Sequence, residues 1–209
     1  MRSWTVGFWD RFFEIVSWVS LFRLLRPVVR PLSTPGGVEV WVTGHLLLAF
    51  AAASYSVYGS SRLAVQLFMW YGALRVFEII VYQTNVLLFD QLRAHRNGQQ
   101  YALEGYTRII LLLMQNYLEI VLWFAVAISY FIPEVGVDVH RTLPELLANS
   151  FANFTGFGPS VLKPDTTGAQ AWIWAESAAG LFMSIVVLAR FISILPAPRS
   201  KTPGEWQDD

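Results

Sequence analysis

Long apolar stretches separated by short polar segments dominate the chain. Residues 40–58, 63–89, 109–132 and 171–195 are each predominantly apolar. A helix needs about 20 such residues to cross a bilayer. We therefore predict an all-α membrane protein with four transmembrane helices.

The segment before the first apolar stretch has an amphipathic pattern instead. Within residues 4–25 the charged side chains fall largely away from an apolar series at helical spacing, formed by Phe8, Phe12, Ile15, Val19 and Phe22. This pattern predicts an interfacial helix that lies along the membrane surface. The turn-rich residues 31–37 then lead into the first span.

Between the third and fourth spans, residues 142–145 (Thr-Leu-Pro-Glu) have the sequence of a capping box. In this motif the Thr142 hydroxyl accepts a hydrogen bond from the backbone N–H of Glu145, and the glutamate reaches back. Proline suits the first turn of the helix that begins here. The apolar face of this helix consists of Leu143, Leu146, Leu147, Ser150, Phe151 and Phe154.

This short helix runs for about 12 residues before glycines end it, a rise of about 18 Å. The hydrocarbon core is about 30 Å thick, so the helix cannot cross it. We therefore predict a re-entrant segment that enters the membrane and returns on the same side. A glycine-rich external loop beside a surface helix is the alternative.

The short helix ends in Thr155-Gly156-Phe157-Gly158. Non-helical backbone at membrane depth is tolerated only inside protein or along a water-filled path. Glycine adopts left-handed conformations at little cost, so alternating glycines let successive carbonyls point to one side. Four such strands around an axis form rings of oxygens that replace a cation's hydration shell. The negative C-terminal end of the helix also favours cations, so this segment is a candidate selectivity filter.

Roughly residues 106–195 resemble the pore module of the potassium channel superfamily. The order of elements is the same: a span, a capped short helix, a Gly-aromatic-Gly segment and a final span. Residues 116–119 (Asn-Tyr-Leu-Glu), followed by 123–125 (Trp-Phe-Ala), are similar to small bacterial members with two extra spans before the pore. Residues 176–181 (Glu-Ser-Ala-Ala-Gly-Leu) are similar to the inner helix, where a glycine, here Gly180, commonly forms the gating bend. The resemblance implies a homotetramer, because each chain supplies one filter strand.

The candidate filter departs at two positions from the family's Thr-Val-Gly-Tyr-Gly followed by aspartate. Without a gap, Phe154 replaces the threonine of the innermost ion site, and Pro159 replaces the aspartate that braces the outer filter. Phe157 in place of tyrosine is a common family variant. With a one-residue deletion, Thr155 matches the threonine and one ring of carbonyls is lost. The resemblance implies a K⁺ channel; the alternatives are a non-selective channel that also passes Na⁺ and a non-conducting membrane subunit.

Lys and Arg residues lie mostly on one side of the four predicted spans. That side carries eleven of them, whereas the other carries only Arg62, Arg141 and Lys163. By the positive-inside rule both termini are cytoplasmic and the short helix is external, in a plasma membrane or a bacterial inner membrane. The expected units are residues 1–37 (interfacial helix and linker), 38–105 (two-span unit), 106–195 (pore module) and 196–209 (cytoplasmic tail).

Ionisable side chains inside spans are costly and are usually paired or functional. Arg75 and Glu78 lie three residues apart on one face of the second span, and Glu119 lies mid-way along the third. An ion pair of Arg75 with either glutamate would neutralise both partners. Such a pair could be structural and hold the first spans onto the pore, or it could belong to a voltage sensor. A voltage sensor needs several gating charges in each subunit, and this chain offers one.

Glu176 and Gly180 in the last span each allow more than one interpretation, and Asn116 in the third span is a further polar candidate. Glu176 could brace the filter from behind, set the potential at the outer mouth, or hydrogen-bond to the short helix. Gly180 could be the gating bend or a site of close helix packing. Asn116 could add a hydrogen bond between helices.

Composition narrows the remaining classes of function. The 209-residue chain is 55% hydrophobic, has a formal net charge of +0 at pH 7 and contains no cysteine. These values exclude thiol chemistry and Cys-based metal sites, and they offer no basic surface for nucleic acid. No pattern pairs a nucleophile with a base, so we expect neither an enzyme nor a bound cofactor. The expected partners are membrane lipid, further copies of the chain and permeant monovalent cations.

Overall fold

The computed structural model describes residues 4–16, 34–89, 92–93, 96, 105–131, 142–157 and 162–194. Within these ranges the chain forms six helices and no strand. The helices are α1 (Trp4–Val16), α3 (Pro35–Tyr58), α4 (Arg62–Leu88), α6 (Tyr106–Tyr130), α8 (Leu143–Thr155) and α9 (Thr167–Ile194). The predicted all-α fold class is confirmed.

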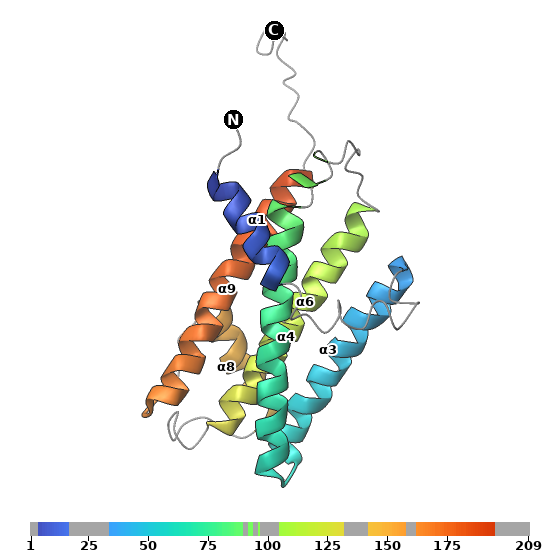
Figure 1. Ribbon diagram of the computed structural model, residues 1–209. Helices are drawn as coiled ribbons and strands as arrows, with labels where there is room; N and C mark the ends of the chain where they lie inside the picture. Colours follow the sequence, from blue (N-terminus) through green and yellow to red (C-terminus); the bar gives the residue numbers. More distant parts are fainter. Residues whose placement is uncertain are drawn as a thin grey trace, which may run out of the picture.

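Four of these helices, α3, α4, α6 and α9, are long and apolar enough to cross a membrane. They coincide with the four predicted spans and identify the chain as a multi-pass membrane protein. The four helices lie side by side as a bundle (Figure 1). An even number of spans returns the chain to its starting side, so α1 and the last turn of α9 lie at the same end of the bundle (Figure 1).

Short polar side chains determine where α3 and α4 begin. The Thr34 side chain caps α3 by accepting a hydrogen bond of 3.1 Å from the backbone N–H of Gly37. Ser61 caps α4 in the same way, with a bond of 3.3 Å from the N–H of Ala64. Because such caps satisfy N–H groups that no helical carbonyl can reach, they set the first residue of each helix.

The core of the bundle lies around α6. Every residue of α6 from Glu119 to Ile128 is buried, because α3, α4, α8 and α9 all pack against this helix. A helix that is apolar on all sides is typically surrounded in this way. The approach of α4 is close at Gly72, where a Cβ atom would lie 2.7 Å from the indole ring of Trp123.

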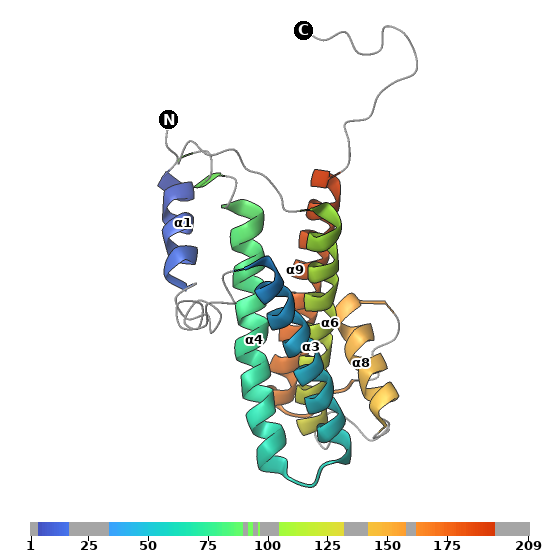
Figure 2. The same cartoon turned by 90° about the vertical axis from the view of Figure 1, so that its right-hand side faces the viewer.

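The short helix α8 packs against α6 and α9, on the side of the bundle away from α1 (Figure 2). Its C-terminal end lies near the middle of both helices. The Phe154 ring meets that of Tyr117 in α6 at 4.8 Å between centroids, and the Phe154 backbone lies against Gly180 in α9. α8 therefore ends about half-way along the bundle.

The N-terminal helix α1 packs beside the end of α4. The Phe13 and Phe89 rings lie 5.7 Å apart, and the Asp10 carboxylate accepts bonds of 3.0 Å from Arg93 and 2.7 Å from Arg96. In both views α1 runs steeply beside α4 (Figures 1 and 2). Residues 17–25 of the predicted interfacial helix lie outside the described residues, and its place on a membrane surface stays a prediction.

Candidate functional site

The start of α8 is where the sequence predicts it, but its cap is different. Thr142 is the N-cap residue, and proline occupies the first turn. The Thr142 hydroxyl donates a 2.5 Å hydrogen bond to the Glu145 carboxylate and accepts none from a backbone N–H. The predicted capping box is therefore wrong, because the carboxylate is the stronger partner for the hydroxyl.

The end of α8 contains the residues of the candidate filter. Phe154 and Thr155 form its last helical residues, and Gly156 ends the helix at φ 69° and ψ 9°. This left-handed conformation is the one in which glycine commonly terminates a helix. The non-helical part of the described segment therefore consists of Gly156 and Phe157, while Gly158 and Pro159 lie outside the described residues.

Side-chain contacts distinguish the residues at this end of α8. The Phe154 side chain is buried, whereas Phe157 is 80% exposed. The Thr155 hydroxyl donates to the Phe151 carbonyl at 2.7 Å and accepts from the Phe157 N–H at 3.2 Å. Thr155 therefore holds the chain as it leaves the helix, and Gly156 and Phe157 are exposed on the single chain.

Behind α8, the buried carboxylate of Glu176 joins this helix to α9. It accepts hydrogen bonds from the Ser150 hydroxyl at 2.5 Å and from the Asn153 amide at 2.7 Å. The Ser150 hydroxyl also lies 2.8 Å from the Val121 carbonyl of α6. The predicted bond from Glu176 to the short helix is thus present, and three helices meet at this carboxylate.

Gly180 lies one turn further along α9, directly against α8. A Cβ atom at Gly180 would overlap the Phe154 carbonyl oxygen and lie 2.6 Å from the carbonyl carbon. Both of these atoms are backbone atoms, so no side chain can rotate away to make room. Glycine at this position allows the close approach of the two helices, and its role as a gating bend stays a prediction.

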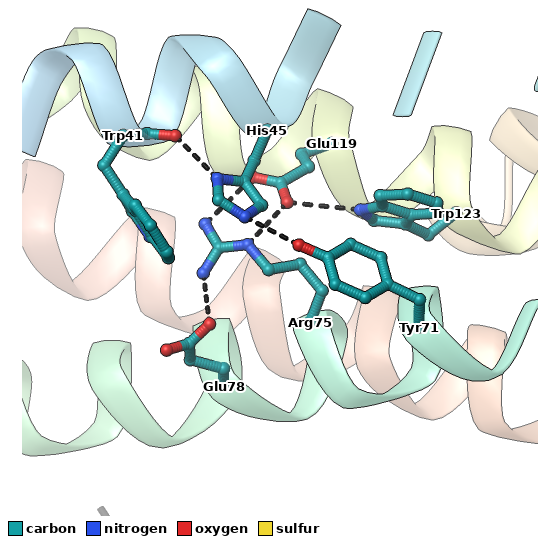
Figure 3. Close-up of polar contacts among 7 residues, drawn as sticks. All are labelled: Trp41, His45, Tyr71, Arg75, Glu78, Glu119 and Trp123. Atoms are coloured by element: carbon teal, nitrogen blue, oxygen red, sulfur yellow. Dashed lines mark hydrogen bonds and ion pairs between the residues drawn. The ribbon is translucent and has the colours of Figure 1, made fainter. Parts of the chain in front are cut away.

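The predicted intramembrane charges come together between α4 and α6 (Figure 3). Arg75 donates from Nε and Nη2 to the two carboxylate oxygens of Glu119, at 2.9 Å and 3.3 Å. Its Nη1 donates to Glu78 at 2.5 Å. The Trp123 indole adds a bond of 3.2 Å to Glu119. The sequence leaves open which glutamate pairs with Arg75, and in the structure both do.

A second hydrogen-bonded chain lies beside this cluster and extends it to α3 (Figure 3). Nδ1 of His45 lies 2.8 Å from the Trp41 carbonyl, and Nε2 lies 2.8 Å from the Tyr71 hydroxyl. Because a carbonyl can only accept, Nδ1 carries the proton and, in the neutral ring, Nε2 accepts from Tyr71. The three helices α3, α4 and α6 are thereby linked through polar side chains in their interior.

Sequence reasoning missed the residues that satisfy Glu176. Ser150 and Asn153 lie three residues apart on the same face of α8, which is a signal that the sequence does contain. Ser150 lies on the apolar face of this helix, and a hydroxyl on such a face needs a hydrogen-bond partner when it is buried.

Comparison with known proteins adds no assignment to these sites. No protein-family model matches the chain, and neither a curated protein nor a solved structure matches it significantly. Within the described ranges, no group of three or more His, Cys, Asp or Glu side chains could hold a metal ion.

Proposed function

We propose that four copies of this chain form a cation channel, with α8 as the pore helix, the residues after it as the selectivity filter and α9 as the inner helix. The observation that carries this proposal is the place where α8 ends. Its last turn lies beside Tyr117 and Gly180, near the middle of two helices long enough to cross a membrane. If these helices span the bilayer, Gly156 and Phe157 lie deep within it and α8 is re-entrant.

Exposed surface on the single chain supports the assembly of several copies. Gly156 and Phe157 are exposed, although non-helical backbone is tolerated at membrane depth only inside protein or along a water-filled path. One face of α9 is also exposed, through Ser177, Leu181, Ser184, Ile185 and Leu188. Further copies around a common axis would cover this face and enclose the path.

The charge at the end of α8 supports a cation as the permeant ion. The last turn of α8 contains no basic residue, so no positive side chain of that turn offsets the partial negative charge at the C-terminal end of the helix. This end would face the ion path in the assembly, and carbonyl oxygens there would replace water around the ion.

K⁺ is the expected ion because the filter resembles that of the potassium channel superfamily. A channel that also passes Na⁺ is the second candidate, and the helical state of Phe154 and Thr155 favours it. A longer pore helix leaves fewer extended carbonyls for the filter than the family's five-residue motif provides. Fewer rings of oxygens would discriminate less between the two ions.

The proposed orientation places both termini in the cytoplasm of a plasma-membrane or bacterial inner-membrane protein. Arg93, Arg96 and Arg190 lie near the end of the bundle at which α1 packs and α9 ends. A concentration of basic residues at one end supports the cytoplasmic assignment of that end.

Recordings from the purified chain in planar bilayers would test the proposal. We expect cation currents whose reversal potential in opposed K⁺ and Na⁺ solutions gives the selectivity. Gly156→Ala places an L-residue in a left-handed conformation, which costs about 1–2 kcal/mol, and should alter or abolish these currents. Gly44→Ala is the matched control, because a Cβ atom there meets nothing within 4 Å. Intact tetramers that carry no current, or that carry anions, would overturn the proposal.

A further inference from the structure

A small cavity lies where α3, α4 and α6 meet. Its volume is about 50 Å³, and its wall includes Val38 and Val42 in α3, Arg75 and Ile79 in α4, and Asn116 in α6. The wall therefore combines apolar side chains with one charged group and one amide.

The volume of the cavity limits what it can hold. One water molecule needs a cavity of roughly 10–15 Å³, whereas benzene binds in an engineered cavity of about 150 Å³. A cavity of about 50 Å³ thus has room for water but not for an aromatic ring.

Asn116 independently indicates that this cavity binds a ligand. The residue is only 4% exposed, and its Oδ1 has no hydrogen-bond partner within the described part of the chain. A buried amide oxygen is rarely left without a donor, because an unpaired polar group is costly away from water. The ligand must therefore be able to donate a hydrogen bond to Asn116.

The chemistry of the wall distinguishes among small ligands. A lipid acyl chain has no group that donates a hydrogen bond to Asn116 Oδ1. A metal cation could bind to an amide oxygen, but the Arg75 guanidinium in the same wall would repel it. A small neutral hydroxyl compound has neither disadvantage, and water is the smallest of these.

Arg75 can supply the second hydrogen bond that water needs. A guanidinium has five N–H donors, and the bonds of Arg75 to Glu78 and Glu119 use three of them. A water oxygen in the cavity can accept a bond from a further N–H of Arg75 while the water donates to Asn116. Two polar partners are enough to hold a buried water molecule.

We propose that this cavity is a binding site for water, and that one water molecule bridges Asn116 Oδ1 and the Arg75 guanidinium. The bridge joins α6 to α4, and it is a water-mediated form of the hydrogen bond between helices for which Asn116 is a candidate. Water binds here without any change in the charge of the surrounding groups. The site lies apart from the candidate filter and does not depend on the proposed channel function.

Radiolytic footprinting of the full chain in lipid nanodiscs tests the proposal, because hydroxyl radicals formed from a bound water molecule oxidise the side chains beside it. Ile79 and Ile120 are a matched pair of buried isoleucines, 3% and 0% exposed. Of the two, Ile79 lines the cavity and Ile120 does not. We expect Ile79 to be oxidised several-fold faster than Ile120.

Asn116→Leu replaces the amide by an apolar side chain of similar shape and removes the acceptor of the bridging water. Oxidation of Ile79 should then fall several-fold, toward the rate of Ile120. Gln115→Leu is the control, because it makes the same kind of change one residue earlier in α6 and outside the cavity wall. Circular dichroism and thermal unfolding would establish that both variants are folded.

Equal oxidation of Ile79 and Ile120 in the wild-type protein would overturn the proposal, and this comparison needs no variant. Wild-type oxidation of Ile79 in a folded Asn116→Leu variant would overturn it as well.

Electron cryomicroscopy at a resolution that shows ordered water provides a second measurement. We expect a separate density peak within hydrogen-bond distance of Asn116 Oδ1. A direct bond from the Trp41 indole to this oxygen, or the density of an acyl chain in the cavity, would contradict the proposal. Neither footprinting nor this map measures ion flux, so a negative result would leave the proposed channel function standing.

Discussion

Gly180→Ala is the substitution that most sharply tests how α8 is held. The added methyl group would occupy the space of the Phe154 carbonyl, 2.6 Å from its carbon, where ordinary contacts begin at 3.4 Å. Because both sides of this contact are backbone, α8 and α9 must separate by a shift of the order of 1 Å. The same shift would stretch the short bonds from Ser150 and Asn153 to Glu176, one turn away.

Overpacking of a well-packed site costs about 1–3 kcal/mol. For a chain of this size about 1 kcal/mol lowers Tm by about 2–4 °C, so we expect Tm to fall by several degrees. Gly44→Ala provides the reference, since it is the same change inside a helix with open space around the new Cβ atom. Any gain in helix propensity, about 0.8–1 kcal/mol for this change, is common to both variants and cancels in the comparison.

Thermal unfolding of both variants in the same detergent is the assay. We expect Gly180→Ala to unfold several degrees below Gly44→Ala. Equal Tm values would refute the close contact between α9 and α8. If Tm is unchanged but channel opening is altered, Gly180 acts as the gating bend that the family resemblance implies.

Three further predictions concern polar contacts. Ser150→Ala removes a buried donor to Glu176 and should lower the free energy of unfolding, measured by chemical unfolding, by about 1–3 kcal/mol. The control Ser129→Ala removes only a bond within its own helix and should have little effect. Equal losses of stability in the two variants would contradict this prediction. Arg75→Gln leaves two buried carboxylates without their cation and should cost about 3–5 kcal/mol in the same assay, so wild-type stability would show that the cluster is not held as described. Asp10→Asn should raise hydrogen exchange in α1 without changing the Tm of the bundle, because Asp10 holds α1 to Arg93 and Arg96; unchanged exchange would argue against that attachment.

The four spans could be predicted from the sequence because length and apolar content alone decide whether a helix can cross a bilayer. The start of α8 could also be predicted, since Thr142 with a proline two residues later, Pro144, is a local signal. The hydrogen bond that Thr142 makes could not be predicted. Its hydroxyl can bond to the backbone N–H of Glu145 or to the carboxylate of Glu145, and the sequence does not show which bond forms.

Contacts between residues that lie far apart in the sequence were harder to predict than local structure. The sequence places Arg75 and Glu78 on one helical face but leaves open whether Arg75 pairs with Glu78 or with Glu119, because the bonds to Glu119 depend on how α4 and α6 pack. Glu176 meets its partners across 26 and 23 residues of sequence. The end of α8 at the first glycine was predicted, because Gly156 is a local stop signal, whereas the resemblance to an extended filter gave no reason to expect the filter residues Phe154 and Thr155 to be helical.

Electron cryomicroscopy of the chain in lipid nanodiscs with K⁺ tests the central claim most directly. The account predicts a four-fold assembly in which the segments at Gly156 and Phe157 face one another around the axis, with ion density between their carbonyls. A single chain, or an assembly in which these residues face lipid or bulk solvent away from any symmetry axis, would contradict it.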